Sequence, residues 1–252
     1  MAAPTISVIV VTRDRPALLA DALADVLAQS HAPLELRLAD DGDVAVVESL
    51  PELPLLELTA IRGRFGRAGA ARNAAAAEAR GDVLAFLDDD DRWRADHLEG
   101  FARAFADDPS LAFAWRDCEV VREVVGADGT RTTGGRTTIA RDWDDELMRT
   151  NDYLPPSGWA VRRELFERLG GFDELFRFSE DWDFVLRAAV VTRPRRVPGA
   201  TVEVRLRPEG NASADFGEER RECLTRLAAR HGLPPLEMRT FWEVALAMGE
   251  AS

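Results

Sequence analysis

Short apolar runs alternate with amphipathic stretches along the first hundred residues. Continuous runs rich in Val, Ile and Leu are typical of strands buried on both faces of a parallel sheet. Such runs occupy residues 5–12, 34–39, 55–60 and 82–87. Apolar residues at helical spacing predict helices over residues 16–29 and 68–80, with Gly81 ending the second. This alternation with short connections predicts right-handed βαβ units and a parallel sheet.

The pattern loosens after residue 95. Helical spacing returns at residues 95–106, 180–191, 216–230 and 235–248, and strand-like patterns occupy residues 111–125 and 196–207. The stretch 126–135, rich in glycine and threonine, predicts a hairpin turn or a loop. No repeat or linker-like segment interrupts the sequence, so we expect residues 1–252 to form one α/β domain.

Composition narrows the classes of function. Apolar residues make up 46% and charged residues 31%, a mix typical of a soluble globular domain. The 32 basic and 45 acidic residues give a net charge of −13, which argues against broad binding to nucleic acid or anionic lipid. No apolar run is long enough for an integral membrane segment. Cys118 and Cys223 are too few for a disulfide framework, which fits a cytoplasmic location.

Polar side chains follow three of the expected strands. These endings are Thr12-Arg13-Asp14, Asp40-Asp41-Gly42 and Asp88-Asp89-Asp90-Asp91. In an open parallel sheet, ligands bind beyond the carboxyl ends of the strands. We therefore expect the three endings to serve one ligand.

The four consecutive aspartates have two interpretations. Four adjacent carboxylates repel one another, so the run is either a solvated acidic loop or is neutralised by a cation. It directly follows a buried strand and precedes Trp93, which favours a cation at the sheet edge. Carboxylate oxygens suit Mg²⁺ or Mn²⁺, and such an ion could bridge a diphosphate as a Lewis acid.

Other candidate residues also leave alternatives open. Asp40 and Asp41 either form a turn before Gly42 or accept hydrogen bonds from a nucleobase or ribose. Arg67 and Arg72, near the start of an expected helix, are either surface residues or partners of phosphate oxygens. Tyr153, Trp159 and Trp182 either pack in the core or stack on a sugar.

Glu180 and Asp181 open the expected helix 180–191, directly after Ser179. One interpretation is an N-cap serine followed by acids that the helix dipole favours. The other is that one carboxylate faces a cleft and acts as a general base. The sequence contains no dinucleotide fingerprint, Walker A, GxSxG, HExxH or CxxC pattern, and its three scattered histidines are expected to be structural.

Five segments in order resemble the family-2 glycosyltransferases with the GT-A fold. They are SVIVVTRDRP (7–16), LADDGD (38–43), GRAGAARNAAAAEARGDVLAFLDDDDRW (66–93), RRELFERLGGFDE (162–174) and SEDWDFVLR (179–187). Each segment alone is weak evidence for the family, but the order and spacing of all five across roughly the first 190 residues make the resemblance specific. The resemblance implies a Rossmann-like fold: a mainly parallel central sheet flanked by helices, a smaller mixed sheet and C-terminal helices. It divides the domain into a nucleotide-sugar-binding half (1–110), an acceptor-binding half (111–205) and a C-terminal helical extension (206–252).

The same resemblance implies roles by position. It places Thr12, Asp14, Asp40 and Asp41 at the nucleobase and ribose, and it places Arg72 near the nucleotide. Asp88 and Asp90 look like the outer acids of the DXD motif, with Asp90 as the main ligand of Mn²⁺ or Mg²⁺ and Asp89 grouped with the nucleotide contacts.

For the chemistry, the resemblance implies an inverting displacement on a nucleoside-diphosphate sugar. Asp181 looks like the catalytic base that deprotonates an acceptor hydroxyl, with Glu180 as its neighbour. One departure concerns Arg207, which stands where many relatives carry a histidine. Arginine cannot ligate a metal but pairs with phosphate, so this exchange would weaken dependence on the ion.

Two alternative functions remain: a sugar-1-phosphate nucleotidyltransferase and a non-catalytic sugar-nucleotide-binding protein. The first resembles this chain less, because the glycine-rich loop of those enzymes is absent from RDRPALL at residues 13–19. The second has no need for a base such as Asp181. The expected donors are uridine, thymidine or guanosine diphosphate sugars, and the acceptor is expected to be a soluble small molecule or glycan bound near residues 126–157. The oligomeric state is left open.

Overall fold

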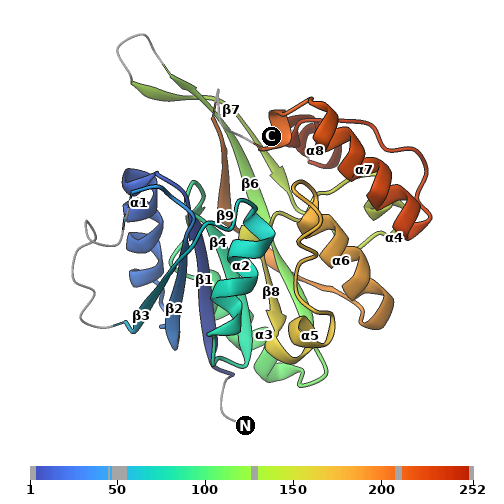
Figure 1. The fold of residues 1–252 in the computed structure, drawn as a ribbon. Coiled ribbons are helices and arrows are strands. Elements are labelled where there is room, and N and C mark those ends of the chain that lie inside the picture. The colour runs from blue at the N-terminus through green and yellow to red at the C-terminus, as the bar shows by residue number, and fades with distance from the viewer. Residues whose placement is uncertain (1–3, 45, 47–55, 126–129, 208–211, 250–252) are drawn as a thin grey trace.

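A computed structural model describes residues 4–44, 46, 56–125, 130–207 and 212–249. Within these residues, nine strands form one sheet in the order β3-β2-β1-β4-β8-β6-β9-β5, and β7 pairs with β6 (Figure 1). The strands are β1 (Ile6–Thr12), β2 (Glu35–Asp40), β3 (Leu58–Arg62), β4 (Val83–Asp88), β5 (Arg92–Trp93), β6 (Phe113–Val125), β7 (Arg131–Ile139), β8 (Trp159–Arg162) and β9 (Arg195–Leu206).

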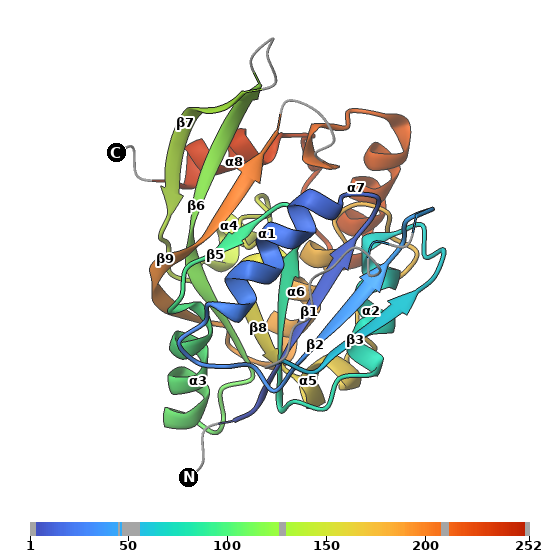
Figure 2. The ribbon, with the colours of Figure 1, turned by 90° about the vertical axis from the view of Figure 1, so that its left-hand side faces the viewer.

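Helices cover both faces of the sheet (Figures 1 and 2). One face carries α1 (Pro16–Leu27) and α3 (His97–Asp107), and the other carries α2 (Ala68–Ala77), α5 (Arg163–Arg168) and α6 (Glu180–Val191). The short α4 (Asp145–Met148) and the C-terminal pair α7 (Glu218–His231) and α8 (Phe241–Met248) lie beside α6. Two single 3₁₀ turns span Pro156–Gly158 and Ala212–Ala214. None of the described helices is long and apolar enough to cross a membrane.

The expected fold class is confirmed. β1, β2, β3 and β4 are mutually parallel, as the first hundred residues predict, and β8 joins them antiparallel to a mixed half built from β5, β6, β7 and β9. The mixed part is thus hydrogen-bonded to the parallel part and continues the same sheet. β1 and β2 are buried along almost their whole length, which explains the nearly continuous apolar sequence of β1. In β2 the charged residues Glu35, Arg37 and Asp40 are buried together with the apolar ones.

Strand register brings the three polar endings together. Thr12 at the end of β1 is aligned with Asp40 at the end of β2, and Val11 is aligned with Asp88 at the end of β4. Because these strands are parallel, all three chains leave the sheet at the same edge. The expectation that their polar ends are neighbours is confirmed.

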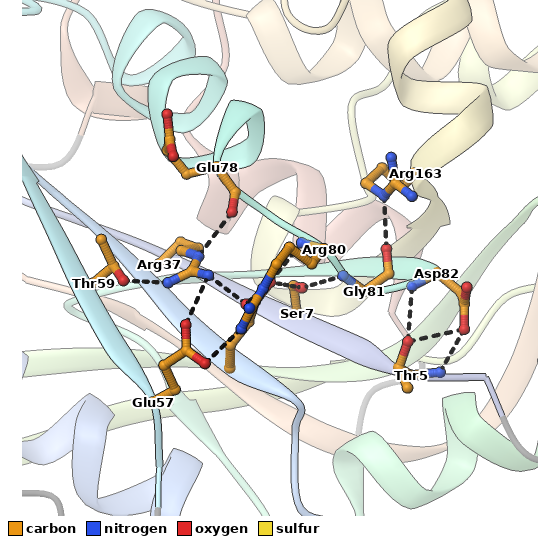
Figure 3. Close-up of polar contacts among 11 residues, drawn as sticks. Thr5, Ser7, Arg37, Glu57, Thr59, Glu78, Arg80, Gly81, Asp82 and Arg163 are labelled. Atoms are coloured by element: carbon orange, nitrogen blue, oxygen red, sulfur yellow. Dashed lines mark hydrogen bonds and ion pairs between the residues drawn. The ribbon is translucent and has the colours of Figure 1, made fainter.

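The opposite edge of the parallel sheet is held by ion pairs (Figure 3). Glu35, fully buried in β2, accepts hydrogen bonds from Ser7 Oγ at 2.7 Å and from the backbone and side-chain nitrogens of Arg80. Arg37 also pairs with Glu35, and its Nε donates to the Glu78 carbonyl at 3.0 Å. These contacts fix the end of α2 to the start of β1 and β2, far along the sheet from the polar endings.

Several expected boundaries were wrong for identifiable reasons. α2 ends at Ala77 instead of Arg80, because the chain turns there and Arg80 reaches back to Glu35. β3 runs over Leu58–Arg62 instead of 55–60, because pairing with β2 sets its limits; Leu55 lies outside the described residues. α8 begins only at Phe241, where Thr240 and Glu243 form a capping box.

Other elements were not expected at all. Residues 126–135 were expected to form a hairpin turn or a loop, and β6 and β7 do pair antiparallel across this stretch. Strand β7 already begins at residue 131, because its threonines pair with β6; residues 126–129 lie outside the described residues. β5, β8, α4 and α5 are each six residues or shorter and carry no periodic pattern of useful length. In contrast, α6 has the expected bounds, and residues 113–125 form one strand.

Candidate functional site

Acidic side chains converge at the end of β4. Asp88, Asp90 and Asp91 each offer one carboxylate oxygen, and these oxygens lie within 4.8 Å of one another. Asp91 is buried, where its carboxylate accepts hydrogen bonds from Ser157 Oγ at 2.6 Å and from the Arg205 backbone at 3.1 Å. Three clustered hard oxygen donors are the chemistry that Mg²⁺ and Mn²⁺ prefer. These residues therefore fit a divalent cation.

Asp89 points elsewhere. Its Oδ2 accepts a hydrogen bond from Thr12 Oγ1 at 2.6 Å, and its Oδ1 pairs with Arg15 Nη2 at 3.0 Å. Burial raises the pKa of Asp89 to about 7, against the opposing charge of Arg15. Since Asp89 is only 1% exposed, the interpretation of the aspartate run as a solvated loop is wrong.

Two arginines reach the third aspartate of the run. Arg15 Nη1 lies 2.9 Å from Asp90 Oδ2, and Arg207 also pairs with this oxygen. Arg15 lies in the turn before α1 and Arg207 directly follows β9, so the two cations come from distant parts of the sequence. Repulsion within the aspartate run is thus offset by positive charge from outside it.

Glu180 and Asp181 begin α6 at the same edge of the sheet. Ser179 precedes them at the N-cap position, as expected, but it has a left-handed backbone (φ 62°) and its side chain makes no capping hydrogen bond. The expected acids do occupy the first turn of the helix. Gly69 of α2 packs against Glu180: a Cβ at Gly69 would lie 3.1 Å from Glu180 Cγ and 3.2 Å from Phe172 Cβ. The small residue therefore allows α2 to approach α6 closely.

Arg72 joins the two acidic groups. From α2, its Nη2 lies 2.6 Å from Asp88 Oδ1 and its Nη1 lies 2.8 Å from Glu180 Oε1. All three side chains are largely withdrawn from solvent, with Arg72 4% exposed. One guanidinium thus links the end of β4 to the start of α6, although 92 residues separate Asp88 from Glu180 in the sequence.

Burial and neighbouring charge perturb the acids of α6. Desolvation raises the pKa of Glu180 to about 7, with the Asp181 charge adding to the rise and Arg72 opposing it. Desolvation also raises the pKa of Asp181, opposed by Arg72 and by the Trp182 backbone N–H, which donates to Asp181 Oδ1 at 2.9 Å. Carboxyl groups with raised pKa values beside a cavity are suited to accept a proton near neutral pH.

A cavity of about 320 Å³ collects these groups. The predicted site residues on its wall are Arg72, Asp88, Asp89, Asp90, Glu180 and Asp181. Thr12 and Arg207 support this wall through their contacts with Asp89 and Asp90. The aspartate run and the start of α6 therefore share one cavity.

The remaining predicted residues hold the neighbouring loops. Asp40 accepts from the backbone N–H groups of Gly42 and Val46, and Asp41 accepts from those of Phe65 and Gly66. Asp14, with a left-handed φ of 52°, accepts from the backbone N–H groups of Asp43 and Val44. Asp14 and Asp40 thus hold the loop after β2, and Asp41 holds the loop after β3. The contact of Asp40 with Gly42 fits the turn-forming interpretation, whereas Asp41 acts on a distant loop.

Arg67 and the three aromatic candidates make contacts within the protein. Arg67 donates to the backbone carbonyl of Glu174. Tyr153 and Trp159 are fully buried, and Trp182 is 5% exposed with its indole N–H bound to the Met148 carbonyl. The interpretation of these aromatic residues as core packing is confirmed.

Sequence reasoning missed several groups on the cavity wall, including Arg15, Asp152, Arg220 and Phe241. A compensating cation near the aspartate run could have been anticipated, and Arg15 directly follows Asp14 at a strand end. Asp152 lies in an irregular stretch, and Arg220 and Phe241 come from C-terminal helices outside the resembling segments. No periodic or motif signal marks these three residues.

Comparisons with known proteins agree with this geometry. The sequence profile of glycosyl transferase family 2 matches residues 7–170. The chain is 35% identical over 240 residues to the uncharacterised glycosyltransferase YwdF of Bacillus subtilis, covering 94% of this chain and 87% of that protein. It is 27% identical to an uncharacterised glycosyltransferase of Haemophilus influenzae, of which it spans only 61%.

Solved structures share the fold. Residues 1–349 of TarS from S. aureus, in complex with UDP-GlcNAc, match with a TM-score of 0.65 and 18% identity, over 97% of this chain and 71% of that chain. The mannosyltransferase PcManGT from Pyrobaculum calidifontis, in complex with GDP-Man and Mn²⁺, matches with a TM-score of 0.61 and 20% identity, over 97% and 68%. With the family profile matched over more than half of its length, the chain belongs to glycosyl transferase family 2 and is a glycosyltransferase with the GT-A fold.

Proposed function

We propose that this glycosyltransferase moves a sugar from a nucleoside-diphosphate donor to an acceptor hydroxyl with inversion at the anomeric carbon. The observation that carries this proposal is Arg72, which contacts both the aspartate run through Asp88 and the α6 acids through Glu180. A single displacement needs charge stabilisation on the donor side and a base on the acceptor side. Asp88, Asp90 and Asp181 all lie on the same cavity wall, as this division of labour requires.

Asp181 is the proposed general base. It takes the proton from the acceptor hydroxyl, whose oxygen forms a bond to the anomeric carbon while the bond from that carbon to the diphosphate oxygen breaks. The pKa of Asp181 is raised by burial, which makes its carboxylate a stronger proton acceptor than an exposed aspartate. Glu180 is held by Arg72 and acts by positioning that arginine.

The donor is proposed to bind between the aspartate run and the loops after β1 and β2. Asp88 and Asp90, with Asp91 beside them, would hold a Mn²⁺ or Mg²⁺ ion, since their oxygens cluster within 4.8 Å. When bound there, a divalent cation supplies positive charge that stabilises the departing diphosphate. Arg15 and Arg207, which pair with Asp90, are placed to contact phosphate oxygens.

The nucleoside is proposed to lie against the loops that Asp14, Asp40 and Asp41 hold, with Thr12 at the end of β1 and Asp89 behind it. UDP-GlcNAc and GDP-Man, the donors bound in the two structural neighbours, are the first candidates. The proposed acceptor is a soluble small molecule or glycan. Cys118 and Cys223 are both buried and unpaired, which supports the proposed cytoplasmic location.

The test measures nucleoside diphosphate release from a panel of nucleotide sugars, with Mn²⁺ and with EDTA, followed by NMR of the product anomer. We expect Asp90→Ala and Asp181→Asn each to abolish transfer, and only Asp90→Ala to weaken donor binding in calorimetry. The exposed Glu164→Gln, on α5, is the matched control and should leave both unchanged. Full transfer in both site variants, or a retained anomeric configuration, would overturn the mechanism. Pyrophosphate release from a nucleoside triphosphate in the presence of a sugar 1-phosphate would favour the nucleotidyltransferase. Binding of a nucleotide sugar without turnover would favour a non-catalytic protein.

A further inference from the structure

Asp152 is a cavity acid that the proposed displacement does not use. It lies in the irregular chain between α4 and the turn Pro156–Gly158, on the wall that also carries Glu180 and Asp181. Its Oδ1 is buried and, among the described residues, has no hydrogen-bond partner. Burial raises the pKa of Asp152 well above its ordinary value, and the charges of Asp181 and Glu180 raise it further.

A buried carboxylate oxygen without a partner is costly to the folded protein. An unsatisfied buried polar group costs about 1–3 kcal/mol, and more when it is charged. Such groups are uncommon in folded proteins unless a ligand completes them. The position of Asp152 on a cavity wall makes a bound ligand the natural source of the missing hydrogen bond.

The neighbouring cation Arg220 does not supply this hydrogen bond. Arg220, from α7, lowers the pKa of Asp152 by its charge, yet its N–H groups are directed to backbone carbonyls. Its Nη1 donates to the carbonyls of Ser213 at 2.7 Å and Asp215 at 3.0 Å, and its Nη2 donates to that of Arg239 at 2.6 Å. Arg220 therefore holds the chain before α7 and α8 in place and does not satisfy Asp152 Oδ1. The Leu154 backbone N–H also lowers the pKa of Asp152 by hydrogen bonding to its carboxyl group, but Oδ1 itself has no partner among the described residues.

A side cavity of about 70 Å³ continues from the main one at this point. The two share Asp152, Ser179, Ser213, Arg220 and Phe241 in their walls. The side cavity is closed by residues of α6, α7 and α8, which lie together in Figure 1. Space for a ligand group thus extends from beside Asp181 toward the C-terminal helices, past the unpartnered oxygen of Asp152.

We infer that this region is an acceptor subsite, completed by the C-terminal helices, in which Asp152 Oδ1 accepts a hydrogen bond from a second hydroxyl of a neutral polyol or sugar. The inference rests on the proposed function, since it assumes that Asp181 faces the reacting hydroxyl. A hydroxyl donor satisfies the oxygen that the chain leaves without a partner. The acidic side chains of Asp152, Glu180 and Asp181 gather at this point, which disfavours a carboxylate- or phosphate-bearing acceptor group there.

Measurements of donor turnover distinguish the proposed role of Asp152 in acceptor binding from the role of Asp181 as the base. With UDP-GlcNAc or GDP-Man and Mn²⁺, nucleoside diphosphate release is measured in water alone and with glycerol, glucose or N-acetylglucosamine added. At a pH above the acid limb, where the proposed base is ionised in both proteins, we expect Asp152→Asn to keep the donor KM and the release in water. Under the same conditions it should lower polyol-stimulated kcat/KM about 10-fold or more through acceptor KM. Asp181→Asn should lose release with every acceptor, and the exposed Glu164→Gln serves as control.

Thermal unfolding tests whether Asp152 has a purely structural role. Asp152→Asn keeps the shape of the side chain and removes a buried charge, so its Tm should equal or exceed that of the wild type. A lower Tm with equal loss of release in water would make Asp152 structural and overturn the inference. Unchanged polyol stimulation in Asp152→Asn, or wild-type release in water that no polyol increases, would also overturn it. Absence of any donor turnover by the wild type would instead contradict the proposed function.

Discussion

Arg72 is the side chain on which both sides of the proposed site depend. Burial alone would lower the pKa of its guanidinium, but the charges of Asp88 and Glu180 raise it, so the group stays protonated. The ring of Phe172 lies 5.5 Å from its central carbon and adds a cation–π contact. A lysine ammonium is a compact charge and does not offer two forked N–H pairs to two carboxylates. Arginine at this position therefore fixes geometry as well as charge.

Replacing Arg72 should change the pH dependence of transfer. The proposed base must be ionised, so the rate rises as pH passes through the raised pKa of Asp181. Arg72 lowers that pKa, and Arg72→Met removes the opposing charge. The acid limb of kcat against pH should therefore move to higher pH, and the maximal rate should fall by about 10²-fold as the two acidic groups lose their link.

Arg72→Lys is the matched control because it keeps the positive charge. Its acid limb should stay near that of the wild type while its rate still falls. Glu180, Asp181 and Asp152 interact, so the limb reports the group of acids rather than one residue. An acid limb that stays in place in Arg72→Met would show that Arg72 does not tune the base.

At the residue scale, motifs predicted the acids but not their partners. Asp88, Asp90, Glu180 and Asp181 belong to runs whose residue types and spacing are conspicuous in the sequence, and they do share one cavity. Arg72 was expected either at the surface or near phosphate oxygens; it is buried, and its pairing with two carboxylates was not predicted. Which cation meets which carboxylate depends on side chains brought together from distant segments, and local patterns carry no such information.

At the element scale, α7 is attached to α6 through one buried acid. Asp183 of α6 is fully buried and pairs with Arg187 of its own helix at 2.7 Å. From α7, Arg230 and His231 reach the same carboxylate at 3.0 and 2.8 Å. Burial raises the pKa of Asp183, but the hydrogen bond from His231 and the charge of Arg187 lower it more, so the net shift is downward.

Asp183→Asn should destabilise the protein strongly. Removing one member of a buried ion-pair network leaves the other charges uncompensated and costs about 3–5 kcal/mol in the free energy of unfolding. Because the folded pKa of Asp183 lies below its unfolded value, its contribution is complete above about pH 4 and is lost as the pH falls through the folded pKa. Urea unfolding of both proteins should show a large difference at pH 7 that shrinks toward pH 3.

The exposed pair of Arg163 and Glu167 on α5 provides the comparison. Glu167→Gln breaks an ion pair of similar length at the surface, where such pairs contribute little. The role given to burial would be contradicted if both variants lost the same free energy of unfolding. It would also be contradicted if the loss in Asp183→Asn did not depend on pH.

Elements with long patterns were predicted well, and short ones were not. α6 matched its expected bounds because twelve residues carry a clear amphipathic period. β8 has four residues, and only its hydrogen bonds with β4 and β6 make it a strand. The residues expected to continue α2 to Arg80 have good helix propensity, but the contact between Arg80 and Glu35 outweighs that preference.

At the scale of the whole molecule, the two edges of the parallel sheet carry different buried charges. At one edge, Glu35 meets Arg37 and Arg80 and fixes α2 to the strands, away from the cavity (Figure 3). At the other edge, Asp88 and Glu180 meet Arg72 on the cavity wall. Both clusters pair buried carboxylates with arginine, so burial and pairing alone do not identify a functional site. The distinguishing feature is the cavity.

Variants at the two edges should therefore respond differently when the Tm is measured with and without ligand. Glu35→Gln removes the buried countercharge of Arg37 and leaves it only the half-exposed Glu57, so the Tm should fall. The rise in Tm produced by UDP or GDP with Mn²⁺ should stay as in the wild type. That rise corresponds to about 2.7 kcal/mol of added stability at a ligand concentration 100 times Kd.

Asp90→Ala should do the opposite, with a Tm near that of the wild type and no rise on adding the ligand. EDTA should erase the rise in the wild type and in Glu35→Gln alike, because both keep Asp88, Asp90 and Asp91; a rise that survives EDTA would mean that arginines alone hold the diphosphate.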